Sequence, residues 1–125
     1  MIEKIELEYM FNTSPRVLYN RLSTPAGLSE WFADDVNLKN GLYSFEWDGN
    51  EQYAEVISKK DNKHIRFKWI DDDEDDTYFE FKLQKDELTG DLALLVTDFV
   101  TQDEIADASD LWDKQIAELK HAIGL

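Results

Sequence analysis

The segment 101-TQDEIADASDLWDKQIAELKHAIG-124 decides the fold of this chain. Its apolar residues recur every three or four positions, a spacing that places them on one face of an α-helix. Thr101 and Glu104 have the spacing of a capping box, and Gly124 can adopt the left-handed conformation that commonly ends a helix. The segment therefore predicts a long amphipathic helix that covers an apolar surface. The apolar face consists of Ile105, Ala108, Trp112, Ile116, Leu119 and Ile123.

The preceding sequence predicts a β-sheet on which this helix can lie. Apolar and polar residues alternate in several segments, which is typical of strands with one buried face. Turn sequences such as Asn40-Gly41 separate these segments. An almost continuous apolar run at 92–100 is expected for a strand that is covered on both sides. In segment 53–59 both faces carry apolar residues, so its register stays open. The alternating segments are 5–11, 43–47, 65–69 and 79–83.

Two short helices are predicted between the first strand and the hairpins. Each begins with a residue that favours the N-cap followed by proline, at Ser14-Pro15 and at Thr24-Pro25. Leu28, Trp31 and Phe32 follow the second pair at spacings of three and four residues. We therefore expect these three side chains to share one face of the second short helix.

Together these elements predict an α+β fold in a single domain, residues 1–125. We expect about six to seven strands in a curved antiparallel sheet wrapped on the long C-terminal helix, because consecutive hairpins give an antiparallel meander. A sheet that curls around a helix leaves a natural pocket between them.

The composition argues against several classes of function. The chain carries 28 Asp and Glu against 13 Lys and Arg, a formal net charge of -15, and such a surface repels nucleic acids and anionic membranes. The absence of cysteine excludes disulfides and thiolate zinc sites. We find no signal-peptide pattern and no apolar run long enough to span a membrane. We therefore expect a cytoplasmic protein without stable membrane association, as a monomer or a weak dimer.

Two segments resemble a known family. Residues 23–32, STPAGLSEWF, resemble the T-P-x-x-L-x-x-W-F stretch of the SRPBCC/START-like superfamily, in the branch named after the activator of Hsp90 ATPase. Residues 111–120, LWDKQIAELK, resemble the G-W-x-x-x-L-x-x-L-K that closes members of that branch. The resemblance implies a helix-grip (START/Bet v 1-like) fold over essentially the whole chain. It also implies a cavity between sheet and long helix, which binds apolar small molecules in many members.

The candidate ligand-binding residues are mostly aromatic residues on the expected inward faces. Rigid rings suit flat or greasy ligands and favour a cavity wall. The alternative is that the rings fill the core, because each buries roughly 150–250 Å². The predicted cavity-lining set is Trp31, Phe32, Tyr43, Phe45, Trp47, Phe67, Trp69, Phe79, Phe81, Asp98, Trp112 and Ile116.

Asp98 is the one carboxylate in the apolar run at 92–100. A carboxylate in such a strand either faces solvent or lies buried with a hydrogen-bonding partner and a raised pKa. The register of this segment leaves both interpretations open, so Asp98 is either a strand-end residue or a polar anchor for a ligand.

The acidic run at 71–76 does not fit a calcium-binding loop. Such a loop needs glycine at position six and a bidentate glutamate at position twelve, whereas this chain has Asp76 and Lys82 there. We expect a solvated hairpin loop, with only a weak divalent site as its alternative. The two histidines, His64 and His121, lie outside any hydrolase or metalloprotease motif. The sequence therefore predicts no metal site and no cofactor.

Three hypotheses about function remain. The first is non-catalytic binding of a small hydrophobic or amphipathic molecule, including lipids, between sheet and helix. The second is a protein-interaction module of the Hsp90-activator type, whose acidic surface docks a basic partner. The third, ranked last, is a cyclase- or hydrolase-like enzyme, which would require an Asp, Glu or His that points into the cavity with a perturbed pKa.

Overall fold

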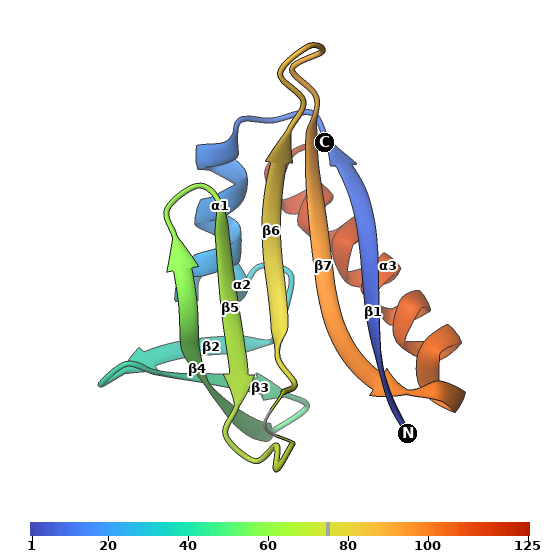
Figure 1. The fold of residues 1–125 in the computed structure, drawn as a ribbon. Helices are drawn as coiled ribbons and strands as arrows, with labels where there is room; N and C mark the ends of the chain where they lie inside the picture. The colour runs from blue at the N-terminus through green and yellow to red at the C-terminus, as the bar shows by residue number, and fades with distance from the viewer. Residues whose placement is uncertain (75) are drawn as a thin grey trace.

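The computed structural model describes residues 1–74 and 76–125. The chain forms an antiparallel sheet, two short helices after the first strand, and one long helix at the C-terminus (Figure 1). The elements are β1 (Ile2–Phe11), α1 (Pro15–Ser23), α2 (Pro25–Leu28), β2 (Asp35–Lys39), β3 (Leu42–Trp47), β4 (Asn50–Lys60), β5 (His64–Trp69), β6 (Phe79–Lys85), β7 (Leu92–Thr101), the 3₁₀ turn η1 (Gln102–Glu104) and α3 (Ile105–Ile123).

The sheet confirms the predicted α+β fold. Its seven strands run in the order β1-β7-β6-β5-β4-β3-β2, and each neighbouring pair is antiparallel. β2 to β7 form the predicted meander, and β1 pairs with β7 along its whole length. The strands curve strongly, and α3 crosses behind β1 and β7 (Figure 1). This is the helix-grip arrangement. Within the described residues, no helix has both the length and the hydropathy needed to cross a lipid bilayer.

The core lies between the sheet and α3. Trp112, Ile116 and Leu119 are buried on one face of α3, as the spacing of the stripe predicts. The same stripe is half-buried at its two ends. Opposite it, Phe67 and Phe81 project from β5 and β6 and are fully buried. Fully burying a side chain of this size stabilises the fold by about 1.5–3 kcal/mol, and Phe81 contacts α3 directly, with its ring centroid 5.9 Å from that of Trp112.

The C-terminal end of α3 matches the prediction, whereas the N-terminal end does not. Gly124 has φ 92° and ends the helix in the left-handed conformation, as expected. The predicted capping box is wrong, because the 3₁₀ turn η1 separates Thr101 from the first residue of α3. Thr101 makes no hydrogen bond to a backbone N–H of the helix; its hydroxyl instead donates to the carboxylate of Glu104.

The second short helix ends earlier than predicted. α2 stops at Leu28, and Trp31 and Phe32 lie in the turns that follow, where the Phe32 N–H donates to the Leu28 carbonyl at 2.9 Å. All three side chains are nevertheless buried. Close packing holds α2 against α1: a Cβ on Gly27 would lie 2.5 Å from the Asn20 carbonyl oxygen. This contact fixes where the chain turns toward β2.

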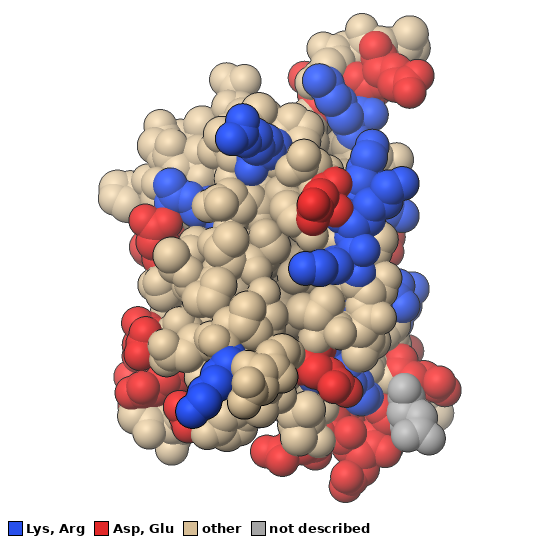
Figure 2. Space-filling model, turned by 90° about the vertical axis from the view of Figure 1, so that its left-hand side faces the viewer, with Lys and Arg blue, Asp and Glu red and all other residues tan. Residues whose placement is uncertain are grey.

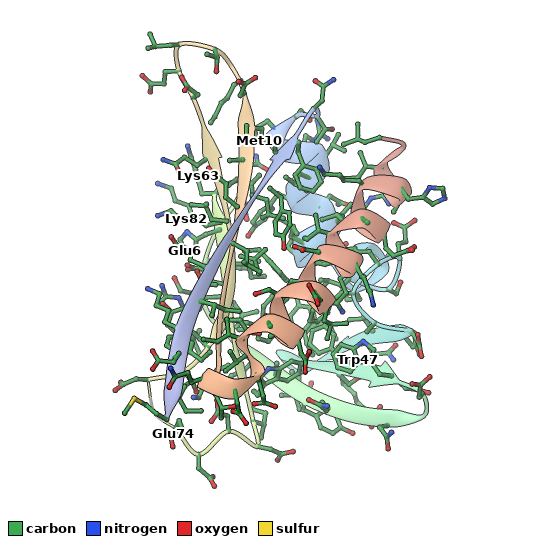
Figure 3. The ribbon with its side chains drawn as sticks, turned by 90° about the vertical axis from the view of Figure 1, so that its right-hand side faces the viewer. Glu6, Met10, Trp47, Lys63, Glu74 and Lys82 are labelled. Carbon is green, nitrogen blue, oxygen red and sulfur yellow. The ribbon has the colours of Figure 1, made fainter. Side chains whose placement is uncertain are left out.

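The outer face of the sheet is open, which corrects the expectation that the strand at 92–100 is covered on both sides. The described helices lie on one side of the sheet only (Figure 3). Ala93 and Thr97 face outward from β7 but are buried, because side chains of the neighbouring strands shield them. Figure 2 shows lysine and arginine gathered along the edge that belongs to this outer face. Lys63 and Lys82 point outward there, away from α3 (Figure 3).

Candidate functional site

A cleft of about 610 Å³ opens between the sheet and the N-terminal half of α3. The strands contribute residues from β3, β4, β5 and β7, and the turn after α2 contributes one ring. Trp47, at this end of the molecule, lies on the side of the sheet that carries α3 (Figure 3). The lining consists of Phe32, Trp47, Gln52, Trp69, Asp98, Val100, Glu104, Asp107, Ala108, Leu111, Trp112 and Gln115.

Phe32 is the centre of the aromatic wall. Its ring centroid lies 5.4 Å from that of Trp47 and 5.9 Å from that of Trp112. Its backbone carbonyl accepts two hydrogen bonds, from Trp47 Nε1 at 2.8 Å and from Gln115 Nε2 at 3.1 Å. One carbonyl group thereby joins the turn after α2 to both β3 and α3. The wall is consequently fixed before any ligand arrives, which lowers the entropic cost of binding.

Asp98 lies on the α3 side of β7, where it lines the cleft. Its Oδ2 accepts a hydrogen bond from Trp112 Nε1 at 3.0 Å, and its Oδ1 accepts one from the Phe99 backbone N–H at 2.8 Å. Burial raises the pKa of this carboxyl above its ordinary value, although the two hydrogen bonds act in the opposite direction. Of the two interpretations that the sequence leaves open, the structure has the one in which Asp98 is a partly buried, hydrogen-bonded carboxylate.

The predicted cavity-lining residues divide into two groups. Phe32, Trp47, Trp69, Asp98 and Trp112 line the cleft. The others lie outside its lining and are buried around it: Trp31, Tyr43, Phe45, Phe67, Phe79, Phe81 and Ile116.

The buried group forms the layer that supports the cleft. Phe79 stacks on Phe67, with ring centroids 4.8 Å apart, and packs at the same distance against Trp69. Tyr43 and Trp31, the two members of this group with a polar atom in the side chain, donate hydrogen bonds to backbone carbonyls of α1. Tyr43 donates its hydroxyl to the Ser23 carbonyl at 2.7 Å, and Trp31 Nε1 donates to the Arg21 carbonyl at 2.8 Å. These bonds attach α1 to the sheet and to the turn after α2.

Sequence reasoning missed more than half of the lining. The members at 104–115 could have been found from the helical pattern: Ala108 belongs to the apolar stripe, and the others lie three or four residues apart beside it. No comparable signal marks the two strand residues, because their position in the cleft depends on the curvature of the sheet. The missed residues are Gln52, Val100, Glu104, Asp107, Ala108, Leu111 and Gln115.

The acidic loop lies apart from the cleft and is anchored by a lysine. Lys68 Nζ donates to the Thr77 carbonyl at 2.8 Å and lies 3.6 Å from Asp72 Oδ2. Asp71, Asp73, Glu74 and Asp76 are exposed, as expected for a solvated loop, whereas Asp75 lies outside the described residues. Across residues 1–74 and 76–125, no group of three His, Asp or Glu side chains is arranged to hold a metal ion.

A serine–histidine pair also lies outside the cleft. Ser58 Oγ and His64 Nε2 are 2.9 Å apart on the β4–β5 hairpin. In the part of the chain that the structure describes, no carboxylate hydrogen-bonds this ring. The pair therefore lacks the third group that orients the base in a catalytic triad.

Comparisons with known proteins agree with the geometry. A family model described as START-like superfamily domain matches residues 1–125. A solution structure of BfR322 from Bacteroides fragilis is 40% identical, with a TM-score of 0.70, and the match covers 99% of this chain and 93% of that one. A solution structure of the Aha1 dimer from Colwellia psychrerythraea is 20% identical, with a TM-score of 0.80 and coverage of 98% and 97%. CalU16 from Micromonospora echinospora is 14% identical, with a TM-score of 0.73 and coverage of 97% and 74%. The last two likenesses show the fold alone. No curated protein matches the chain.

Proposed function

This chain belongs to the START-like superfamily, and we propose that it binds a small hydrophobic or amphipathic molecule between the sheet and α3 without catalysing a reaction. START-like folds commonly bind hydrophobic ligands. The observation that supports the proposal in this chain is the cleft itself: Phe32, Trp47, Trp69 and Trp112 face a space of about 610 Å³. Ligand sites typically measure about 300–1,000 Å³ and are lined mainly by apolar and aromatic side chains.

The polar groups of the cleft support binding rather than catalysis. Asp98 meets the criterion for the enzymatic alternative, since it lines the cleft and has a raised pKa. However, both of its oxygens already accept hydrogen bonds from protein donors. Among the described lining residues there is no Ser, Thr, Tyr, Lys or His, and neither of the other two carboxylates, Glu104 and Asp107, is hydrogen-bonded to Asp98. The carboxylates of the lining can instead hold a polar group of a ligand.

An NMR ligand screen with a blocking variant tests this proposal. Isotopically labelled protein is titrated with pooled fatty acids, sterols, flavonoids and polyketide-like aromatics. We expect amide shifts around Phe32, Trp69 and Trp112, and we expect Ala108→Phe to abolish them by filling the cleft. Ala106→Phe is the matched control, because Ala106 is exposed on the same helix. Ligand shifts that persist in Ala108→Phe, or no response to any pool, would contradict the proposal.

A second candidate is docking of a basic protein partner, favoured by the acidic exposed surface of α3. Asp107, Asp110, Asp113 and Glu118 are all exposed there. Association through these residues should weaken with added salt, because exposed charges are screened over about 8–10 Å at ordinary ionic strength. A pull-down at low salt that recovers no stoichiometric partner would count against this candidate.

A further inference from the structure

The cleft contains carboxylate oxygens that can accept hydrogen bonds from a ligand. Three of its side-chain N–H groups are in use: those of Trp47 and Gln115 go to the Phe32 carbonyl, and that of Trp112 goes to Asp98. Among the described residues, the indole N–H of Trp69 and the amide of Gln52 donate to no protein group. The acceptors of the cleft are numerous, because the lining includes three carboxylates. Each carboxylate oxygen has two lone pairs, so Asp98 can accept further hydrogen bonds beside the two that it has. These carboxylates can therefore accept hydrogen bonds from a ligand that donates.

The negative charge of the lining residues favours a positively charged donor. Asp98, Glu104 and Asp107 line the cleft, and the described lining residues include no lysine, arginine or histidine. A position near the N-terminus of α3 suits the charge of Glu104 and Asp107, because the helix dipole favours acids there. The helix dipole does not explain Asp98, which belongs to β7 and is kept partly buried beside the indole of Trp112.

The aromatic wall adds a second attraction for a positive charge. Trp47, Trp69 and Trp112 present rings to the same space that the carboxylates border. A cation within about 6 Å of an aromatic ring is stabilised by the ring electrons, and tryptophan is the best of the aromatic residues in this role. The net charge of -15 also raises the local concentration of cations around the whole protein.

We propose that the ligand of this cleft is a protonated amine on a flat apolar body, with its ammonium group toward Asp98 and its rings against the tryptophans. The inference rests on the proposed binding function and names its ligand class. The ammonium N–H groups satisfy the carboxylate acceptors, and the apolar body covers the aromatic wall. A carboxylic acid of the same shape meets three like charges, and a neutral alcohol of the same shape gains no charge pairing.

Three ligands of one shape test this inference: 1-naphthylmethylamine, 1-naphthylmethanol and 1-naphthylacetic acid. Each is titrated into the labelled protein near neutral pH and followed by amide shifts. We expect the amine to bind about tenfold or more tightly than the alcohol, because hydrogen bonds to charged groups are the stronger ones. The acid should bind most weakly. Added salt should weaken binding of the amine and leave binding of the alcohol unchanged.

Two variants identify the carboxylates that are responsible. Asp98→Asn and Asp107→Asn should each weaken the amine severalfold without changing binding of the alcohol. Asp107 is exposed, so its variant keeps the test valid even if Asp98→Asn does not fold. Glu6→Gln is the control, because it makes the same change of charge on the outer face of the sheet (Figure 3).

The outcomes separate the ligand class from the binding function. Equal affinity for amine and alcohol, or an effect of Glu6→Gln as large as that of the cleft variants, would overturn the inference and leave the binding proposal standing. Binding of none of the three ligands would also overturn it. The binding proposal itself falls if the pools of apolar ligands give no response either, or if their shifts persist in Ala108→Phe.

Discussion

The hydrogen bond between Trp112 Nε1 and Asp98 Oδ2, 3.0 Å long, makes a quantitative prediction about stability. Trp112→Phe keeps an aromatic ring in place but removes the only N–H of the side chain. Asp98 then retains the backbone N–H of Phe99 as its one protein donor among the described residues. A hydrogen bond to a charged group contributes about 1.5–3 kcal/mol, and the smaller ring leaves part of the indole volume empty. We expect the free energy of unfolding to fall by about 2–4 kcal/mol near neutral pH.

The pH dependence distinguishes the hydrogen bond from the lost volume. Burial raises the pKa of Asp98 in the folded protein, so protonation of this group favours the folded state. Its contribution to stability is present below the unfolded pKa and is lost as pH rises through the folded pKa. Trp112→Phe removes a donor to the ionised form and should raise the folded pKa further. The difference in stability between wild type and variant should therefore be largest near neutral pH and should shrink on acidification.

Urea unfolding across this pH range is the appropriate assay, because comparing two variants at each pH cancels the general repulsion of the acidic surface. A double-mutant cycle with Asp98→Asn completes the design. The amide that this substitution introduces lacks the negative charge, so Trp112→Phe should cost less in that background, by about 1–2 kcal/mol. If Trp112→Phe costs the same in both backgrounds and at every pH, the indole serves only as volume and the reasoning about Asp98 is refuted.

The packing makes three further predictions. Gly27→Ala should destabilise the protein by about 1–3 kcal/mol in urea unfolding, because the new methyl group would lie 2.5 Å from the Asn20 carbonyl oxygen; an unchanged midpoint would show that α1 and α2 can separate freely. Phe81→Ala should cost about 3–5 kcal/mol in the same assay, since this ring is fully buried, and a loss below about 1 kcal/mol would contradict its place in the core. Burial raises the pKa of Tyr19 to about 12, so an alkaline absorbance titration should lose a late-ionising component in Tyr19→Phe, and no change would contradict the burial of this hydroxyl.

The fold could be predicted because it depends on local patterns. The stripe on α3 and the alternation in β5 and β6 are both properties of a few neighbouring residues, and the apolar residues of each face the core as the period predicts. The errors lie where elements meet. The 3₁₀ turn before α3 and the early end of α2 are set by packing against the rest of the molecule, and a capping motif in the sequence does not report on that packing.

The division between core and cleft could not be predicted from the same patterns. Phe67 and Trp69 are two residues apart on the same face of β5, yet Phe67 is fully buried and Trp69 lines the cleft. The difference depends on where the helices cross the sheet: α1 packs against β5 and β6, whereas α3 packs against β1 and β7. The angle between a helix and a curved sheet has no signature in the sequence of either. The side of β7 on which Asp98 lies could not be predicted for another reason. Both faces of β7 carry apolar residues, so the sequence shows no alternation that would assign Asp98 to one face.

The pairing of β1 with β7 has a consequence for the way the chain is made. Ile2 lies opposite Thr101 and Phe11 opposite Leu92, so residues 12–91 separate the two strands in the sequence. During synthesis on a ribosome, the first strand emerges early and has no hydrogen-bonding partner until the last strand is complete. Contacts this distant in sequence are slow to form, because a long loop must close before they contribute. The meander from β2 to β6 can assemble while translation continues, whereas β1 can join the sheet only after β7 has emerged.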